Sequence, residues 1–180
     1  MEFDKLIEAR RSMRGYDSTK SLTQEDIKKL IYSAIQAPSW KNSQTGRYYC
    51  ILSQKKIQEF KETCLPEFNA KNCSGVSAFI VTAFVKNRAG YDKETTLPVN
   101  ELGNGWGIYD LGLQNENIVL KAKDMGLDTL IMGIRDEAKI KEMLSIPDNE
   151  CVVSVIAVGY GNKEAIKPKR KDVNDIAKFY

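Results

Sequence analysis

The chain has 180 residues, of which 42% are hydrophobic and 28% are charged, and its formal net charge is +3. This length suits a single domain with a proper core, and the small net charge argues against a nucleic-acid partner. The sequence has no apolar run of 18 residues and no apolar leader at its N-terminus. We therefore expect no membrane span, no signal peptide and a cytoplasmic protein.

The absence of histidine restricts the chemistry further. It removes the commonest general acid or base, the commonest neutral metal ligand and every nucleophile that histidine activates. The four cysteines lack C-x-x-C spacing and are predicted to be reduced, packed thiols: Cys50, Cys64, Cys73 and Cys151. We expect no metal site and no catalytic side chain. The composition suits a cofactor that supplies its own reactive atom.

The first predicted element is a short helix that ends in a basic cluster. Phe3, Leu6 and Ile7 recur at helical spacing. The helix leads into Arg10-Arg11-Ser12-Met13-Arg14, where three guanidinium groups and a hydroxyl fall within five residues. Arginine binds phosphate bidentately and stays charged near neutral pH. The cluster therefore predicts an anion site, and the alternative is a solvated basic turn.

The next elements alternate between helices and strands. Thr23 and Asp26 form a capping box, and apolar residues then repeat at helical spacing until Pro38 ends the helix. A strand is expected over residues 47–53, with Tyr49 and Ile51 on one face. A helix should follow over residues 54–63, and residues 78–85 form an apolar run that predicts a buried strand.

The second half begins with a long aperiodic segment, residues 86–105, which is typical of a functional loop. Residues 107–125 predict a helix that is apolar on more than one face, with Ile108 in its main stripe, so we expect it inside the domain or at a subunit interface. A strand over 127–134, a helix over 136–144 and a strand over 151–160 suit a crossover unit against one sheet.

Two polar segments remain. Ala37-Pro38-Ser39-Trp40-Lys41-Asn42-Ser43-Gln44 joins a helix to a strand and offers donors and acceptors that could hold a flat ligand ring, although an ordinary polar turn is the alternative. The tail over 161–180 is basic around Pro168, and a solvated terminus is its simplest interpretation. Phe179 and Tyr180 at its end indicate instead that it docks on something.

Together these segments resemble the FMN-dependent nitroreductase family over nearly the whole chain. The further matching pieces are Asp110-Leu111-Gly112, Gly126-Leu127-Asp128-Thr129, Met132-Gly133, Val158-Gly159-Tyr160 and Pro168-Lys169-Arg170-Lys171. The resemblance implies one α+β domain over residues 1–180, with a central mixed β-sheet flanked by helices. It also implies an intertwined homodimer with one FMN in each of two interface clefts.

The resemblance also implies roles for single residues. Arg10, Ser12 and the basic tail residues Lys169, Arg170 or Lys171 would hold the FMN phosphate and ribityl chain, with Arg11 assisting. Arg14 would reach the N1/O2 edge of the ring, Asn42 would bond its N3/O4 side, and Gln44 of the same motif would also bind the cofactor. Pro38 and Ser39 would come from the partner chain, and the backbone at Met132 and Gly133 would approach N5.

The chain departs from the family pattern in several places. Thr45-Gly46 stands where the family commonly has Pro-Trp, and the segment after Met132 lacks the Gly-Gly or Glu-Gly of many relatives. Trp106, Tyr109 and Tyr91 could lie over the flavin on the substrate side, or could be core or dimer aromatics instead.

The function implied is an FMN oxidoreductase with a ping-pong cycle. NAD(P)H would reduce the flavin, and a small electron-poor acceptor such as a nitroaromatic or a quinone would reoxidise it. The alternatives are a specialised flavin reductase, for dehalogenation or ene reduction, and a non-catalytic protein that binds flavin or polyanions.

Overall fold

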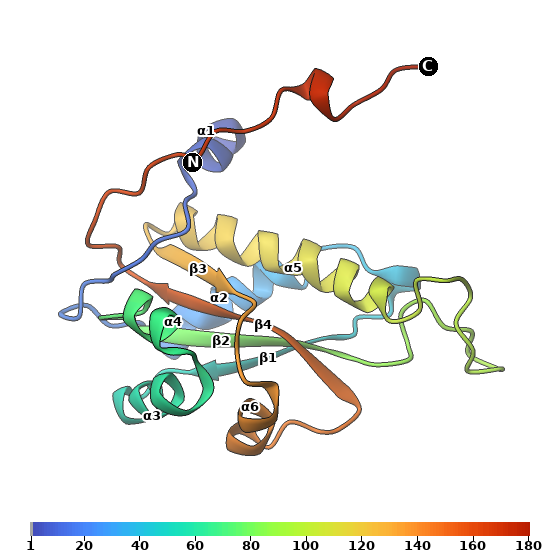
Figure 1. Ribbon diagram of the computed structural model, residues 1–180, viewed down its shortest axis with the longest axis horizontal. Helices are drawn as coiled ribbons and strands as arrows, with labels where there is room; N and C mark the ends of the chain where they lie inside the picture. The colour runs from blue at the N-terminus through green and yellow to red at the C-terminus, as the bar shows by residue number, and fades with distance from the viewer. Residues whose placement is uncertain (1) are drawn as a thin grey trace.

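A four-stranded sheet with strand order β1-β2-β4-β3 forms the centre of the molecule and carries helices on both faces (Figure 1). The structure is a computed structural model and describes residues 2–180. Its strands are β1 (Gly46–Ile51), β2 (Ala78–Val85), β3 (Asp128–Met132) and β4 (Glu150–Gly159). Its helices are α1 (Phe3–Ala9), α2 (Gln24–Ala34), α3 (Gln54–Cys64), α4 (Glu67–Asn72), α5 (Gly105–Asp124) and α6 (Glu137–Leu144). The expected α+β class, with a central sheet between helices, is confirmed.

The sheet is antiparallel at each of its three strand pairings. Its mixed character comes only from an isolated parallel bridge between Ser12 and Thr129. A crossover joins parallel strands, so the crossover unit expected over residues 127–160 is wrong. After α6, whose C-cap Ser145 has a left-handed φ of 52°, the chain turns back and β4 runs antiparallel beside β3.

Two apolar cores lie on the two faces of the sheet. Alternate residues of β2 enter each core, with Phe79 and Val81 facing one way and Ile80 the other. The first core includes side chains from α3 and α6, and the second includes side chains from α2 and α5. Because β2 is covered on both faces, its sequence is an unbroken apolar run, and its predicted bounds are confirmed.

The early elements follow the sequence expectations with small differences. Thr23 and Asp26 form the capping box of α2, as predicted, but the helix ends at Ala34, before Pro38. The two predicted strand faces of β1 are confirmed, because Tyr49 packs against one core and Tyr48 against the other. The short helix α4 was not predicted.

Helix α5 has an unexpected distribution of side chains. Its buried face includes the polar residues Asp110, Gln114 and Asn115, whereas Ile108 and Tyr109 are 48% and 59% exposed. The prediction that Ile108 belongs to the packed stripe is therefore wrong for the single chain. The helix buries polar groups and exposes apolar ones near its N-terminal end, which fits an interface or a binding site better than a simple core.

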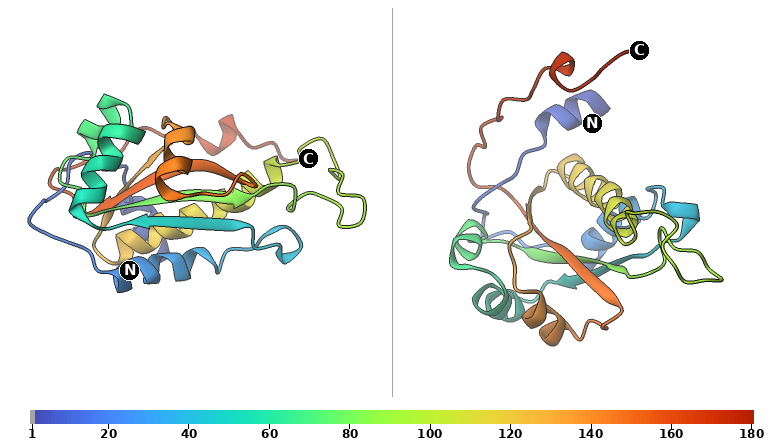
Figure 2. Two further views of the ribbon diagram at one scale, coloured as in Figure 1. Left: turned by 90° about the horizontal axis from the view of Figure 1, so that it is seen from below. Right: turned by 45° about the vertical axis from the view of Figure 1, so that its right-hand side comes forward.

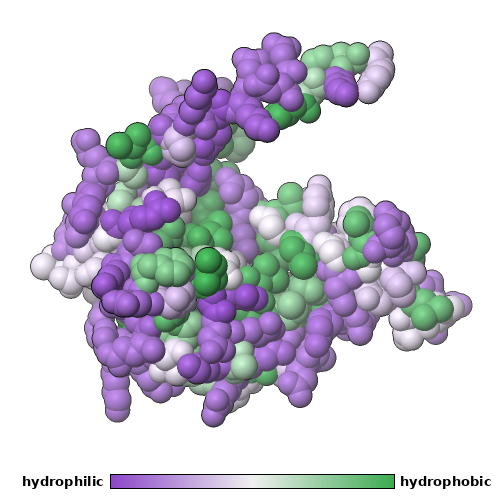
Figure 3. Space-filling model, in the orientation of Figure 1, coloured by the Kyte–Doolittle hydropathy of each residue, from purple (hydrophilic) through white to green (hydrophobic). Residues whose placement is uncertain are grey.

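The two ends of the chain lie together, away from the sheet. Figure 1 and the right-hand view of Figure 2 show α1 beside the C-terminal tail, and the Lys167–Glu8 ion pair joins these two segments. No residue of α1 is buried, and Phe179 and Tyr180 are almost fully exposed. Figure 3 shows apolar side chains gathered over α5 in the space below the tail. Within residues 2–180, no helix is long and apolar enough to cross a membrane.

The four cysteines are free thiols, as expected. Burial raises the pKa of Cys64 to about 11 and that of Cys73 to about 12, so these thiols stay protonated near neutral pH. The expectation that the cysteines are packed is wrong for Cys50, which is exposed on the edge strand β1, on the face that α2 covers only in part.

Candidate functional site

The N-terminal basic cluster, residues 10–14, is held in extended form beside β3. The Met13 amide donates to the Thr129 carbonyl at 2.8 Å, and Ser12 forms the parallel bridge with Thr129. Met13 is buried, while Ser12 and Arg14 on either side are exposed. Successive side chains of an extended backbone point to opposite sides, so Met13 anchors the cluster while Ser12 and Arg14 face outward.

The segment that follows the cluster is fixed by three further contacts. The amides of Gly15 and Tyr16 donate to the carbonyls of Asn72 and Ser74, each at 2.8 Å. The Asn162 side chain donates to the Tyr16 carbonyl at 3.0 Å. The carbonyls of Asn72 and Ser74 follow α4, the helix that was not predicted, so sequence reasoning missed this support.

The C-terminal basic cluster, residues 169–171, lies near the N-terminal one. Lys167 forms an ion pair and hydrogen bond with Glu8 of α1. These contacts with Lys167 lower the pKa of Glu8 most, and the charges of Arg11 and Arg170 lower it further. Segments from the two ends of the chain thus surround one carboxylate. A cavity of about 620 Å³ opens beside them, lined by Lys169, Arg170, Lys171, Asp172 and Asp175.

The charges of the two basic clusters fit a phosphate group. Within residues 2–180, no ion pair joins any of these cations to a carboxylate: Arg10, Arg11, Arg14, Lys169, Arg170 and Lys171. Arg11 and Arg170 instead bond backbone carbonyls near them, Arg10 and Pro168 respectively. An external anion can therefore bind these side chains without displacing a protein carboxylate.

The polar loop over residues 38–44 lies at a different place, against the N-terminal half of α5. It contains the 3-10 turn η1 (Trp40–Asn42), and the Ser39 hydroxyl accepts a hydrogen bond from the Gln44 amide at 3.2 Å. Pro38, Asn42 and Gln44 are exposed, while Ser39 is half-buried. The loop therefore presents its amide side chains outward, as a ring-binding loop must.

Aromatic residues join this loop to α5. The rings of Trp40 and Trp106 lie 4.6 Å apart, and Tyr109 packs against the edge of Trp106 at 5.8 Å. Tyr91 lines a cavity of about 680 Å³ that also touches the loop at Trp40 and Asn42. The structure thus brings Trp106, Tyr109 and Tyr91 to the polar loop. Trp106 is half-buried against Trp40, whereas Tyr109 is open.

Met132 and Gly133 lie at the end of β3. The Met132 side chain is buried, with its sulfur 3.5 Å from the sulfur of Cys73, and Gly133 is exposed with open space around its Cα. A ligand can therefore approach the backbone at Gly133 closely.

One chain keeps the polar loop and the N-terminal basic cluster at opposite ends of α5. Trp40 contacts Asp110 near the start of the helix, whereas Ser12 pairs with Thr129 just beyond its end. The helix from Asp110 to Asp124 spans about 20 Å. The structure therefore brings together the basic residues, and separately the loop with its aromatics, but it does not unite these two groups within one chain.

Sequence reasoning assigned no role to two buried polar residues of α5, although Asp110 belongs to the matching segment Asp110-Leu111-Gly112. The Asp110 carboxylate accepts the Trp40 amide at 2.9 Å, and the Gln114 side chain accepts the Tyr48 hydroxyl at 2.6 Å. Burial raises the pKa of Asp110, and the bond from the Trp40 amide opposes part of this rise. For Gln114 the sequence signal is a polar residue within an otherwise apolar helical pattern, and Asp110 has the matching segment as a second signal.

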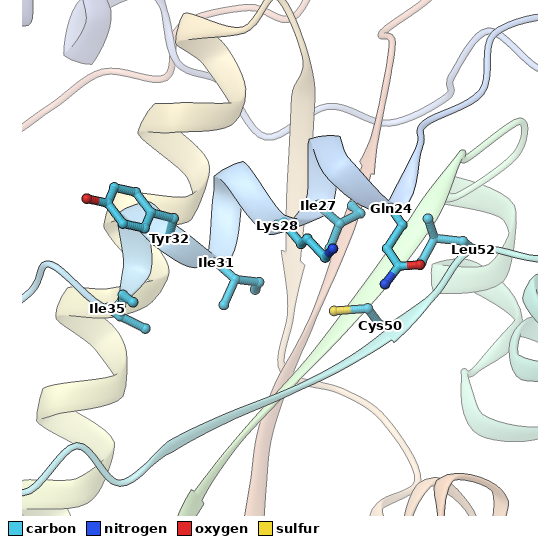
Figure 4. A pocket seen from close by; sticks show the side chains of 8 residues that line it. All are labelled: Gln24, Ile27, Lys28, Ile31, Tyr32, Ile35, Cys50 and Leu52. Atoms are coloured by element: carbon cyan, nitrogen blue, oxygen red, sulfur yellow. The ribbon is translucent and has the colours of Figure 1, made fainter.

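An apolar hollow lies elsewhere, between α2 and the face of β1 that carries Cys50 and Leu52 (Figure 4). It measures about 710 Å³ and is lined by Gln24, Ile27, Lys28, Ile31, Tyr32, Ile35, Cys50 and Leu52. Lys28 is its only cationic side chain, so the hollow does not suit a phosphate and is not part of the basic site. Among residues 2–180, no group of three His, Cys, Asp or Glu side chains could hold a metal ion.

Comparison with known proteins gives matches within one family. The family model described as Nitroreductase family matches residues 7–160. An Archaeoglobus fulgidus protein named "Putative NADH dehydrogenase/NAD(P)H nitroreductase" is 30% identical over 165 residues, which cover 89% of this chain and 86% of that protein.

Solved structures share the fold. A nitroreductase family protein of Streptococcus pneumoniae superposes with a TM-score of 0.85 at 21% identity, covering 99% of this chain and 100% of the other. A structure from Exiguobacterium sibiricum, described as a putative nitroreductase in complex with FMN, gives a TM-score of 0.82 at 23% identity. It covers 100% of this chain and 98% of the other.

Proposed function

The chain belongs to the nitroreductase family, and from that premise we propose that it is an FMN-dependent oxidoreductase. It takes reducing equivalents from NAD(P)H and delivers them to a small electron-poor acceptor such as a nitroaromatic or a quinone, in a ping-pong cycle. When bound, FMN supplies the hydride chemistry that no side chain of this histidine-free chain provides.

The observation that carries this proposal is the meeting of two basic clusters from opposite ends of the chain, whose cations form no ion pair with a carboxylate within residues 2–180. In the proposed site, Arg10, Ser12 and residues 169–171 hold the phosphate and ribityl chain, and Arg11 assists. Arg14 places its charge beside the N1/O2 edge of the ring, where it stabilises the negative charge gained on reduction.

The remaining contacts come from the polar loop and the end of β3. Asn42 bonds the N3/O4 side of the ring, Gln44 of the same loop also binds the cofactor, and the backbone at Met132 and Gly133 lies beside N5. Trp106 and Tyr109 line the side of the flavin that the substrate approaches. The exposure of Asn42, Gln44 and Gly133 supports these assignments.

The proposal includes a homodimer in which Pro38 and Ser39 reach the flavin of the partner chain. Support comes from the separation of the polar loop from the basic clusters along α5. It also comes from apolar side chains that a single chain leaves exposed on α1, α5 and the tail: Phe3, Ile7, Ile108, Tyr109, Ile176, Phe179 and Tyr180. Exposed apolar surface of this kind favours association.

Purified protein tests the function directly. We expect a yellow protein with one FMN per chain that oxidises NADH or NADPH, and whose flavin is reoxidised by a quinone or a nitroaromatic. Flavin uptake without NAD(P)H oxidation would favour the non-catalytic flavin-binding alternative. A colourless protein that binds polyphosphate but no FMN would overturn the enzyme proposal. A single domain over residues 1–180 and a cytoplasmic location remain predictions.

A further inference from the structure

The polar loop over residues 38–44 has a strained backbone. Three of its residues, none of them glycine, have left-handed φ angles: Lys41 at 45°, Asn42 at 54° and Gln44 at 48°. A left-handed conformation costs an ordinary residue about 1 kcal/mol or more, although asparagine tolerates it better. Such a run persists only when contacts outside the loop hold it.

Asp110 of α5 makes a long-range contact that holds this loop. Its Oδ2 accepts the amide of Trp40, the residue before the strained run, at 2.9 Å. The other hydrogen bonds of the loop are local: the Asn42 amide donates to the Ser39 carbonyl at 3.0 Å, and Arg47, at the start of β1, donates to the Gln44 carbonyl at 3.1 Å. Packing of Trp40 on Trp106 restrains the same turn from the side.

Burying the Asp110 carboxylate to make this contact costs desolvation free energy. The residue is 3% exposed, and within residues 2–180 no cation forms an ion pair with it. The Ser43 hydroxyl lies near the carboxylate but does not reach good hydrogen-bond geometry. An apolar side chain would avoid the desolvation cost of a buried charge. A carboxylate at this position therefore indicates a role beyond packing.

We propose that Asp110 is a positioning residue, whose buried carboxylate holds the 38–44 loop in the conformation that presents Asn42 to the flavin. This inference rests on the proposed function. Asp110 touches neither flavin nor substrate in this scheme, and it acts only through the Trp40 amide.

The test compares Asp110→Leu, which removes the acceptor and keeps most of the volume, with Asp110→Asn, whose side-chain carbonyl can still accept the bond. Hydrogen exchange is measured by mass spectrometry on the FMN-saturated protein, in peptides that cover residues 38–44 and 111–122. We expect Asp110→Leu to speed exchange in the loop roughly tenfold and to weaken FMN binding by a similar factor. Exchange over residues 111–122 should stay slow.

The conservative variant and a matched control make the result specific. Asp110→Asn should keep both loop exchange and FMN affinity near those of the wild type. Asn115→Leu removes another buried polar group of α5, one that bonds Thr82 rather than the loop, and should leave loop exchange unchanged. Asp110→Ala removes the same acceptor and replaces Asp110→Leu if the latter does not fold.

Unchanged loop exchange in Asp110→Leu or Asp110→Ala would overturn the inference. A loop that is released while FMN affinity stays the same would also overturn it, because the loop position would then not matter to the flavin. Failure of the proposed function has a different signature, since the wild-type protein would then bind no FMN at all.

Discussion

The basic clusters and the polar loop both belong to the proposed flavin site, but they are built in different ways. The basic clusters are extended, mostly exposed segments from the two chain ends, held by backbone pairing and one ion pair. The polar loop has strained backbone angles, an aromatic stack and a buried carboxylate behind it. We infer that phosphate binding is a sum of separable charges, whereas ring binding depends on a single loop conformation.

The largest expected effect follows from removing the tail after Asn162. This truncation keeps the Asn162 contact with Tyr16 and deletes residues 169–171. Loss of two or three charge-assisted bonds should weaken FMN binding at least roughly 100-fold, as measured by fluorescence titration. Truncation after Lys171 is the matched control: it keeps the basic cluster and should retain affinity within a few-fold, while weakening the dimer in sedimentation. If the protein truncated after Asn162 binds FMN with wild-type affinity, the tail is only a solvated terminus.

A second prediction tests whether the two regions of one flavin site come from different chains of the dimer. Arg14→Gln and a bulky change at Ser39, such as Ser39→Leu, should each reduce activity strongly. If Ser39 serves the flavin of the partner, refolding the two variants together should restore about a quarter of wild-type activity, because half of the dimers then carry one intact site. A mixture no more active than its parents would place Ser39 and Arg14 in the same site.

The third prediction concerns the flavin rather than its affinity. Arg14→Gln, examined with saturating FMN, should lower the two-electron reduction potential by roughly 30 to 60 mV, because one charge-assisted bond to the reduced ring is lost. The measurement is a redox titration against a reference dye. Lys55→Gln, on exposed α3, is the control and should leave the potential unchanged. An unaltered potential in Arg14→Gln would remove this residue from the ring edge.

The smallest effect should come from a position outside both regions. Thr23→Ala breaks the capping box of α2, in which Thr23 and Asp26 exchange hydrogen bonds. We expect about 1 kcal/mol less stability to urea and no change in FMN affinity. A marked loss of FMN affinity in Thr23→Ala would show that the site responds to the overall stability of the protein. The inferred difference between the two regions would then be contradicted.

The sequence predicts the fold well where local signals agree. The capping box of α2 and the unbroken apolar run of β2 identify these elements, because caps and double-sided burial leave clear patterns. The helix α4 was missed because it has six residues and buries only Asn69. The parallel crossover was predicted wrongly because a strand, helix, strand order is typical of a crossover unit, and the order alone does not set the direction of β4 beside β3.

The candidate site is predicted unevenly for a similar reason. Contiguous motifs such as residues 10–14 and 38–44 are visible in the sequence, and the structure places both at the surface. The bond from Trp40 to Asp110 joins residues 70 positions apart, so no local pattern predicts it. The proximity of the two basic clusters likewise depends on the chain ends meeting in space.

The Trp40–Trp106 pair can serve as an intrinsic spectroscopic probe of the 38–44 loop. These are its only two tryptophans, and their rings lie 4.6 Å apart at a tilt of 49°. Indoles this close couple electronically, so the near-ultraviolet circular dichroism and the intrinsic emission of the protein arise largely from one small region beside the 38–44 loop. Loop movement can therefore be followed by spectroscopy without a label, in a background of tyrosines that absorb and emit more weakly.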